Sequence, residues 1–195
     1  MQRDDLSNKL IHFTKGTDKE AADIFLKIIN EYRLLGGKGF IKGGYPCICF
    51  TESPVAKLAY IFTNRNTLNV KYAPFGVMVD KTWLWKKGGR PVIYQSDEEY
   101  ELLHTSQKYR HKRYEPDKGI DFTWEREWRI WTTEMPLEPK ETTLIVPNRT
   151  WVDWLRDSHL EQIRGHVMVM EEDGYQYVQS YPWHFIALSD LGISL

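Results

Sequence analysis

The amino-acid sequence predicts a single domain of the α+β class over residues 1–195. Short apolar segments of strand length recur along the chain, two longer stretches carry helix-start signals, and Asp173-Gly174 separates two strand-like runs as a hairpin turn does. At 195 residues, with 42% hydrophobic and 14% aromatic content, the chain can bury one sizeable core. No repeat, low-complexity tract or linker divides it.

Capping chemistry marks the first strand and the first helix. Residues 10–14 read Leu-Ile-His-Phe-Thr, a short apolar strand with one histidine. Thr17 and Glu20 have the spacing of a capping box, which begins a helix, and Gly36-Gly37 would end it. The predicted apolar face of this helix consists of Ala21, Ile24, Phe25, Ile28, Tyr32 and Leu35.

A glycine-rich loop over residues 36–44 leads to a buried strand over residues 46–50. Residues 51–54, Thr-Glu-Ser-Pro, would end this strand and begin a helix that reaches residue 61, because Pro suits the first helical turn. Glu52 would either cap this helix with its charge or bind substrate.

The rest of the chain is predicted to be mainly strand. Ser96 would cap a short helix over residues 97–103, and a second short helix would cover residues 151–156. Residues 115–119 contain Pro and Gly without an apolar period, which predicts a long surface loop. The remaining strands are expected at residues 75–79, 90–94, 142–146, 167–171 and 175–179.

Residues 123–130 read Thr-Trp-Glu-Arg-Glu-Trp-Arg-Ile and are predicted to form a strand. Alternation along this strand would put Glu125, Glu127 and Arg129 on one face. Glutamate is unfavourable in strands, so two of them between tryptophans indicate an active-site strand. The alternative is a solvated edge strand whose charges pair with a neighbouring strand.

A net charge of −1 excludes a broadly basic protein, so any contact with nucleic acid requires a local patch. Residues 108–113 read Lys-Tyr-Arg-His-Lys-Arg and offer such a patch. Lys108, Arg110, Lys112 and Arg113 would neutralise phosphates while neighbouring tyrosines stack on bases. The alternative is a solvated charged loop.

The cysteines and the absence of targeting signals indicate the cellular compartment of the protein. Cys47 and Cys49 are too close in sequence for an ordinary disulfide, so we expect buried thiols in a reducing environment. No apolar run reaches the roughly 18 residues of a membrane span, and the N-terminus lacks the apolar core of a signal peptide. We therefore expect a cytoplasmic protein with no membrane association.

Three segments in chain order resemble the ADP-ribosyltransferase fold: His12 in a first strand, Thr51-Glu52-Ser53 after a second, and Glu127 in a late strand. The chain looks most like the DarT-like branch, whose members modify nucleic acid. The matching residues are His12 and Thr14, Phe50 with Ser53-Pro54, and Glu127-Trp-Arg-Ile130.

The chain is also similar to AbiGi-like phage-resistance proteins of bacteria. This likeness extends over residues 10–131 and is carried by four segments, which are Cys47 to Pro54, Tyr72 to Val77, Gly89 to Tyr94 and Trp124 to Ile130.

The resemblance implies a split β-sheet core with flanking helices and NAD as the cofactor. Glu127 would be catalytic, because a fixed carboxylate stabilises the oxocarbenium-like charge that develops when nicotinamide leaves the ribose. Glu125 would be the second catalytic residue and would orient or deprotonate the incoming nucleophile. The residues implied to bind NAD are His12, Thr14, Thr51, Ser53, Tyr60 and Arg129.

The predicted function is therefore a NAD-dependent ADP-ribosyltransferase that modifies DNA or RNA, acting as a bacterial toxin or anti-phage effector, with an antitoxin protein as a candidate partner. One alternative is a non-catalytic module of the same fold that binds nucleic acid or an effector. Another is a metal-dependent nuclease that uses Glu125, Glu127 and Asp121. No dedicated metal site is expected from the spacing of His and Cys.

Overall fold

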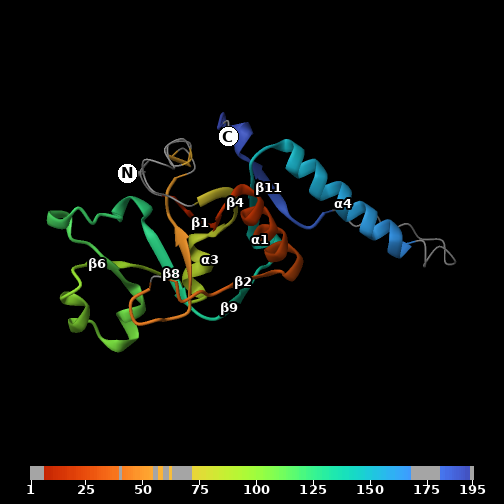
Figure 1. Ribbon diagram of the computed structural model, residues 1–195. Coiled ribbons are helices and arrows are strands. Elements are labelled where there is room, and N and C mark those ends of the chain that lie inside the picture. The colour runs from red at the N-terminus through yellow and green to blue at the C-terminus, as the bar shows by residue number, and fades with distance from the viewer. Residues whose placement is uncertain are drawn as a thin grey trace.

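The computed structural model describes residues 7–39, 41–54, 57–58, 62, 72–167 and 181–193. Its centre is a seven-stranded sheet, flanked by helices (Figure 1). In spatial order the strands are β11 (His184–Ala187), β10 (Thr142–Val146), β4 (Tyr72–Asp80), β1 (Lys9–Lys15), β3 (Cys47–Thr51), β8 (Glu127–Trp131) and β5 (Arg90–Pro91).

All neighbouring strands in this sheet are antiparallel except β10 and β11. The fold is therefore mixed α/β with a mostly antiparallel sheet, in agreement with the predicted class. The predicted strands over residues 10–14, 46–50, 75–79 and 142–146 are confirmed as β1, β3, β4 and β10.

The sheet has a weak seam between β1 and β3. These strands pair only where Ile11 lies opposite Thr51, whereas β3 and β8 pair along their whole length, from Cys47 opposite Trp131 to Thr51 opposite Glu127. The seam joins a four-stranded half, β11 to β1, to a three-stranded half, β3 to β5.

The first helix, α1 (Asp18–Glu31), begins as the capping box predicts. The Thr17 hydroxyl accepts from the Glu20 N–H, and the Glu20 carboxylate accepts from the Thr17 N–H. The helix ends earlier than expected, because Tyr32 adopts the left-handed conformation with a φ of 52° and the chain turns into a short strand, β2 (Arg33–Leu35). β2 pairs with β9 (Glu134–Pro136).

The apolar face predicted for α1 is only partly correct. Ala21, Phe25 and Ile28 are buried, and the ring centroid of Phe25 lies 5.5 Å from that of Phe75 in β4. Ile24 and Leu35 are instead 46% and 53% exposed. The early turn places Leu35 outside the helix, and Ile24 faces away from the sheet.

Apolar side chains cover both faces of the sheet. The core beneath α1 takes alternate residues of the central strands, and the core on the opposite face takes the residues between them. The first core includes Leu10, Phe50, Val77, Trp128 and Leu144, and the second includes Ile11, Phe13, Leu58, Phe62, Met78 and Ile145. Complete burial of one such side chain contributes about 1.5–3 kcal/mol.

Residues 90–94 do not form one strand. They are divided between β5 and β6 (Ile93–Gln95), and β6 pairs in parallel with β7 (His111–Arg113). The predicted helix over residues 97–103 is a 3-10 helix, and its N-cap is Glu98 rather than Ser96. The Ser96 hydroxyl nevertheless accepts from the Glu99 N–H at 3.3 Å. The 3-10 helices of the described residues are η1 (Glu99–Leu102), η2 (Thr105–Arg110), η3 (Pro116–Lys118), η4 (Thr123–Glu125), η5 (Pro139–Glu141) and η7 (Leu188–Leu191).

The strand predicted over residues 123–130 is wrong in its first half. Residues 123–125 form η4, and Arg126 has a positive φ of 44°, so the strand β8 begins only at Glu127. A residue in the left-handed region breaks the two-residue alternation of a strand. Glu125 therefore reaches the site from a turn and not from the strand.

Two further helices complete the described part of the chain. Asp80 caps α3 (Lys81–Lys86), with its Oδ1 2.9 Å from the Thr82 nitrogen. The helix α4 (Arg149–Val167) is longer than the predicted helix over residues 151–156. Among the described residues, no helix is both long and apolar enough to span a bilayer.

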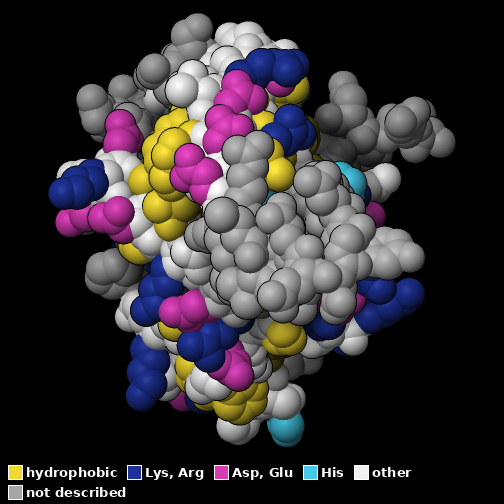
Figure 2. Space-filling view, turned by 90° about the vertical axis from the view of Figure 1, so that its right-hand side faces the viewer, with side chains coloured by type: hydrophobic (Ala, Val, Ile, Leu, Met, Phe, Trp, Pro, Cys, Tyr) yellow, Lys and Arg dark blue, Asp and Glu magenta, His cyan; other side chains and the backbone are white. Residues whose placement is uncertain are grey.

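Figure 2 views the molecule from the side on which α4 lies in Figure 1, and hydrophobic side chains reach the surface there among charged ones. Residues 168–179 of the predicted hairpin and most of the predicted helix that ends at residue 61 lie outside the described residues. Residue 167, the first residue of the predicted hairpin, is the last residue of α4.

Candidate active site

The carboxylate of Glu127 lies at the first position of β8 and is nearly enclosed by protein, with 7% of the side chain exposed. Its Oε1 lies 2.6 Å from Nε of Arg129, and its Oε2 lies 2.9 Å from Nζ of Lys112. Each oxygen therefore faces a cation. Hydrogen bonds between charged groups of this kind are among the strongest in proteins.

The register of the sheet explains why Arg129 meets Glu127. Residues two apart in a strand share a face, and the β3 residues opposite this pair are Thr51 and Cys49. These four side chains therefore lie on one face of the sheet. The predicted placement of Glu127 and Arg129 on one face of the strand is confirmed, and the two side chains form an ion pair.

Glu125 joins the same cluster although it lies outside the strand. Its Oε2 is 2.9 Å from Nζ of Lys112, so one ammonium bridges Glu125 and Glu127. The turn itself is anchored to β3, because the Thr51 hydroxyl donates to the Glu125 carbonyl oxygen at 2.5 Å. Among the described residues, the site therefore brings together the two carboxylates with the cations Arg129 and Lys112.

The two cations keep Glu127 ionised. Burial raises the pKa of this carboxyl, but the charges and hydrogen bonds of Arg129 and Lys112 outweigh burial and bring the pKa down to about 2. Burial lowers the pKa of Lys112, while the charges of Glu127 and Glu125 raise it above the usual value for lysine. At neutral pH the site contains a fixed carboxylate and a fixed ammonium.

Three neutral groups face the carboxylates. Burial and the charges of Glu125 and Glu127 raise the pKa of Tyr72 in β4 well above that of a free tyrosine. Burial also raises the pKa of Tyr94, whose hydroxyl oxygen lies 3.3 Å from the Glu127 backbone nitrogen and accepts its hydrogen bond. The Cys49 thiol has a raised pKa for the same reasons, burial first and the Glu127 charge second.

Sequence reasoning did not place Cys49 in this cluster. The signal that could have done so is the pairing of β3 with β8, because Cys49 lies opposite Arg129. That pairing joins segments far apart in the chain, and a local pattern does not reveal it.

Thr51 and Ser53 hold the end of β3 against the turn that carries Glu125. The Ser53 hydroxyl lies 3.3 Å from the carbonyl oxygen of Trp124, and the Ser53 N–H donates to the Thr51 hydroxyl at 3.2 Å. Both side chains are buried. The structure therefore brings these two predicted NAD-binding residues next to the glutamates.

Glu52 points away from this cluster. Its Oε1 lies 2.5 Å from Nζ of Lys81, and its Oε2 accepts from the indole N–H of Trp128 at 2.8 Å. The residue is 8% exposed. Both carboxylate oxygens are thus used in a buried contact between β3, β8 and α3.

His12 lies on the other face of the sheet. Ile11 is opposite Thr51, so Ile11 shares the face of Glu127 and the neighbouring His12 does not. The His12 ring packs edge-on against Phe50, with 5.8 Å between the ring centroids. The described contacts do not bring His12 to the two glutamates.

The His12 ring nevertheless lies at the seam of the sheet. Its Nδ1 is 2.8 Å from the Cys49 carbonyl oxygen, and burial lowers the pKa of the imidazole, which favours the neutral form. The Thr14 hydroxyl donates to the Phe75 carbonyl oxygen at 3.1 Å, and Thr14 is 2% exposed. Tyr60, the remaining predicted NAD-binding residue, lies outside the described residues.

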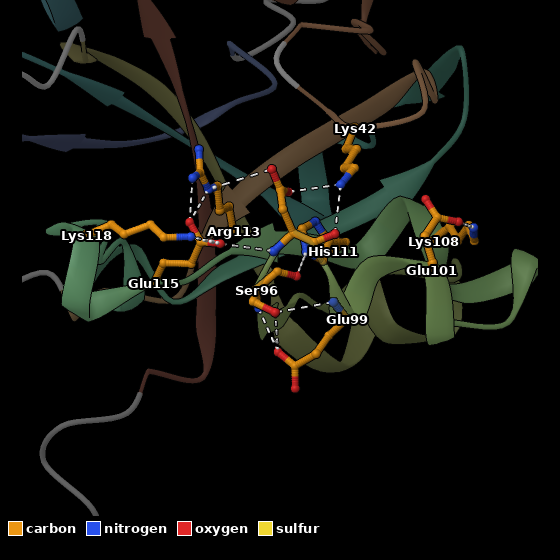
Figure 3. A network of polar contacts seen from close by, with 10 residues as sticks. Lys42, Ser96, Glu99, Glu101, Lys108, His111, Arg113, Glu115 and Lys118 are labelled. Atoms are coloured by element: carbon orange, nitrogen blue, oxygen red, sulfur yellow. Dashed lines mark hydrogen bonds and ion pairs between the residues drawn. The ribbon is translucent and has the colours of Figure 1, made fainter.

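The cations of residues 108–113 are engaged within the protein. Nζ of Lys108 lies 2.7 Å from the Glu101 carboxylate, and Nε of Arg110 donates to the Pro91 carbonyl oxygen at 2.9 Å. The guanidinium of Arg113 pairs with Glu115, as Figure 3 shows. Together with Lys112, all four predicted contacts to nucleic acid have acidic or carbonyl partners inside the chain.

Further ion pairs join the residues around Arg113. Glu115 lies between Arg113 and Lys118 (Figure 3). Glu115 is 6% exposed, and Asp97 pairs with Lys42 at 3.1 Å. Ion pairs therefore connect much of the segment between β6 and η4, which we call the β6–η4 segment.

The described residues contain no group of three His, Cys, Asp or Glu side chains placed to hold a metal ion. Between Glu125 and Glu127, the position that a cation would take is filled by the Lys112 ammonium. The Asp121 carboxylate accepts from the N–H and hydroxyl of Thr123, at 2.8 and 2.6 Å.

In comparisons with known proteins, the chain matches no family model, no curated protein and no solved structure.

Proposed function

We propose that this protein is a NAD-dependent ADP-ribosyltransferase in which Glu127 is the catalytic carboxylate. The observation that supports this most directly is the buried Glu127 side chain, which Arg129 and Lys112 hold in its charged form. A preorganised charge in a site with little water stabilises a developing opposite charge far more than it would in solution.

The reaction calls for such a group. The bond between nicotinamide and ribose breaks, nicotinamide leaves with the bonding electron pair, and positive charge develops on the sugar. Glu127 would stabilise that charge. The acceptor then forms a bond to the same carbon and loses a proton, for which Glu125, within reach of the same ammonium, is the proposed base.

The proposed binding groups for NAD are Thr51 and Ser53 beside the glutamates and His12 with Thr14 at the seam. The weak pairing of β1 with β3 supports this, because it leaves a discontinuity of the sheet next to the carboxylates. The neutral imidazole of His12 suits a hydrogen bond to a ribose hydroxyl.

The proposed acceptor is DNA or RNA, as the resemblance of the segments around His12, Ser53 and Glu127 to DarT-like enzymes suggests. The proposed role is that of a bacterial toxin or anti-phage effector with an antitoxin partner. Among the basic residues, the Arg113 side chain stays 44% exposed while it pairs with Glu115. A partly exposed guanidinium can contact a phosphate without losing its first partner.

The test is incubation of the protein with NAD labelled in the adenylate moiety, in the presence of DNA, RNA or cell protein. We expect label to transfer to a polynucleotide with wild-type protein and not with Glu127→Gln. Glu134→Gln is the matched control, because this residue is also ion-paired but is 57% exposed and lies in β9. Absence of both transfer and NAD hydrolysis would reject the proposal.

One observation favours a second candidate, a non-catalytic module that binds nucleic acid or an effector. Glu127 is 7% exposed and both of its oxygens already have cationic partners, as in a purely structural ion-pair network. Polynucleotide binding that is unchanged by Glu127→Gln, without any turnover of NAD, would favour this candidate over the enzyme.

A further inference from the structure

We infer that Lys112 is a positioning residue of this site, whose ammonium bridges the Glu125 and Glu127 carboxylates and sets their spacing. The effect of Lys112 on catalysis rests on the proposed function, whereas its positioning of the two carboxylates does not.

The bridge is symmetrical. Nζ of Lys112 lies 2.9 Å from Oε2 of Glu125 and 2.9 Å from Oε2 of Glu127, so these oxygens are within about 6 Å of each other, twice the measured distance. The Lys112 side chain is 20% exposed. Its ammonium also lies 4.7 Å from the ring centre of Phe122, a cation–π contact that restrains it further.

The segment that carries Lys112 is itself fastened to β8. Nη1 of Arg129 donates to the carbonyl oxygens of Tyr109 and His111, at 2.9 and 2.7 Å. In the small parallel sheet, Lys112 lies in register with Tyr94, whose hydroxyl accepts from the Glu127 N–H. The β6–η4 segment thus holds the Lys112 ammonium at a fixed position beside the two glutamates.

Charge balance explains why this cation matters. Glu125 and Glu127 carry two negative charges, and Lys112 and Arg129 carry two positive ones. The other titratable groups of the described residues that face Glu127 are Tyr72, Tyr94, Cys49 and Cys47. Burial raises the pKa of each, so these phenols and thiols stay neutral at neutral pH and change neither side of the balance.

Without Lys112, Glu127 would keep Arg129 as its cationic partner among the described residues, and the ammonium between Glu127 and Glu125 would be lost. Two negative charges left this close raise the pH at which one of the carboxylates takes up a proton, as in coupled acids. A protonated Glu127 cannot stabilise a positive charge, and a protonated Glu125 cannot accept a proton from the acceptor. Lys112 would therefore act through both glutamates without touching the substrate.

The test measures ionisation and not only activity. Protein labelled at the glutamate carboxyl carbons is titrated by NMR, with the two signals assigned from Glu125→Gln and Glu127→Gln. In wild type, Glu127 should not titrate above about pH 5, because Arg129 and Lys112 hold its pKa down. In Lys112→Gln, the titration midpoint of Glu127 should rise by about one unit or more, and Lys112→Arg should restore the wild-type behaviour.

Lys118→Gln is the control for loss of a lysine from the same β6–η4 segment, because Lys118 pairs with Glu115 and is 55% exposed. It should leave the titration of Glu127 unchanged. If wild type transfers ADP-ribose, the acid limb of its pH–rate profile should move upward by about one unit in Lys112→Gln and stay in place in Lys118→Gln.

Unchanged titration of Glu127 in a folded Lys112→Gln protein would overturn the inference. Should that variant not fold, titration of Glu127 between about pH 5 and 8 in wild type would overturn it equally. A wild type that shows the expected titrations but never turns over NAD would reject the proposed function and leave the positioning role intact.

Discussion

Replacement of Glu127 by glutamine is expected to affect folding and catalysis separately. Glutamine keeps the shape of the side chain but leaves Arg129 and Lys112 without their shared buried counter-charge. The pKa of Glu127 is about 2 in the folded protein, against a usual value of 4.5. At about 1.4 kcal/mol per unit, this difference corresponds to a loss of about 3 kcal/mol of unfolding free energy at neutral pH.

The fall in the transfer rate caused by Glu127→Gln should be larger than the loss of folded protein alone would produce. If Glu127 stabilises the transition state, the rate of ADP-ribosyl transfer per folded molecule should fall by about two to four powers of ten, with NAD affinity nearly unchanged. The assay is urea unfolding together with the transfer rate, both measured on one preparation of each variant, with Glu134→Gln as the exposed control.

Two results would refute this reasoning. Wild-type turnover by folded Glu127→Gln protein would remove the residue from the mechanism. An unfolding free energy within about 0.5 kcal/mol of wild type would show that the ion pairs around Glu127 contribute little to stability, as surface pairs do.

The acid stability of the protein should depend on Glu127: its folded pKa is depressed, so its contribution is present above about pH 4.5 and is lost as the pH falls toward 2, and Glu127→Gln should flatten the fall in unfolding free energy over this range. A slope equal to that of wild type would contradict this. Glu52→Ala should cost about 3 kcal/mol in urea unfolding, because it leaves Lys81 and the Trp128 indole without their buried acceptor, but should leave transfer per folded molecule unchanged. A cost below about 1 kcal/mol would contradict the buried geometry. Burial raises the pKa of the Cys47 thiol to about 11, so a thiol reagent should react slowly with native protein at neutral pH and rapidly in urea; equal rates would contradict its burial.

The sequence predicts the local elements well because their signals are local. The capping box of Thr17 and Glu20 fixes the start of α1, and apolar runs of strand length mark β1, β3, β4 and β10. Alternation correctly places Glu127 and Arg129 on one face, and their ion pair follows from that placement.

The parts that could not be predicted depend on contacts between distant segments or on a single backbone angle. The positive φ of Arg126 places Glu125 in a turn and not in the strand. Arginine has no special preference for a positive φ, so the residue type does not predict this angle. Lys112 belongs to a basic run that predicts a nucleic-acid patch. Its ammonium lies between the glutamates only because the β6–η4 segment packs against β8.

The face that His12 occupies is another such feature. Its position within the first strand is clear from the sequence, but the side to which it points relative to Glu127 depends on the register of β1 with β3, which is set at Ile11 and Thr51. The roles proposed for His12 and Thr14 in binding NAD therefore remain predictions.

Release of nicotinamide from NAD labelled in the nicotinamide ring tests the catalytic role of Glu127 most directly, because it follows the bond that breaks regardless of the acceptor. Wild-type protein, supplied with DNA, RNA and cell protein, is expected to release nicotinamide, and Glu127→Gln is expected to release it at least about 100-fold more slowly per folded molecule. No release by wild type, or equal release by the two proteins, would contradict the assignment of Glu127 as the catalytic carboxylate of an ADP-ribosyltransferase.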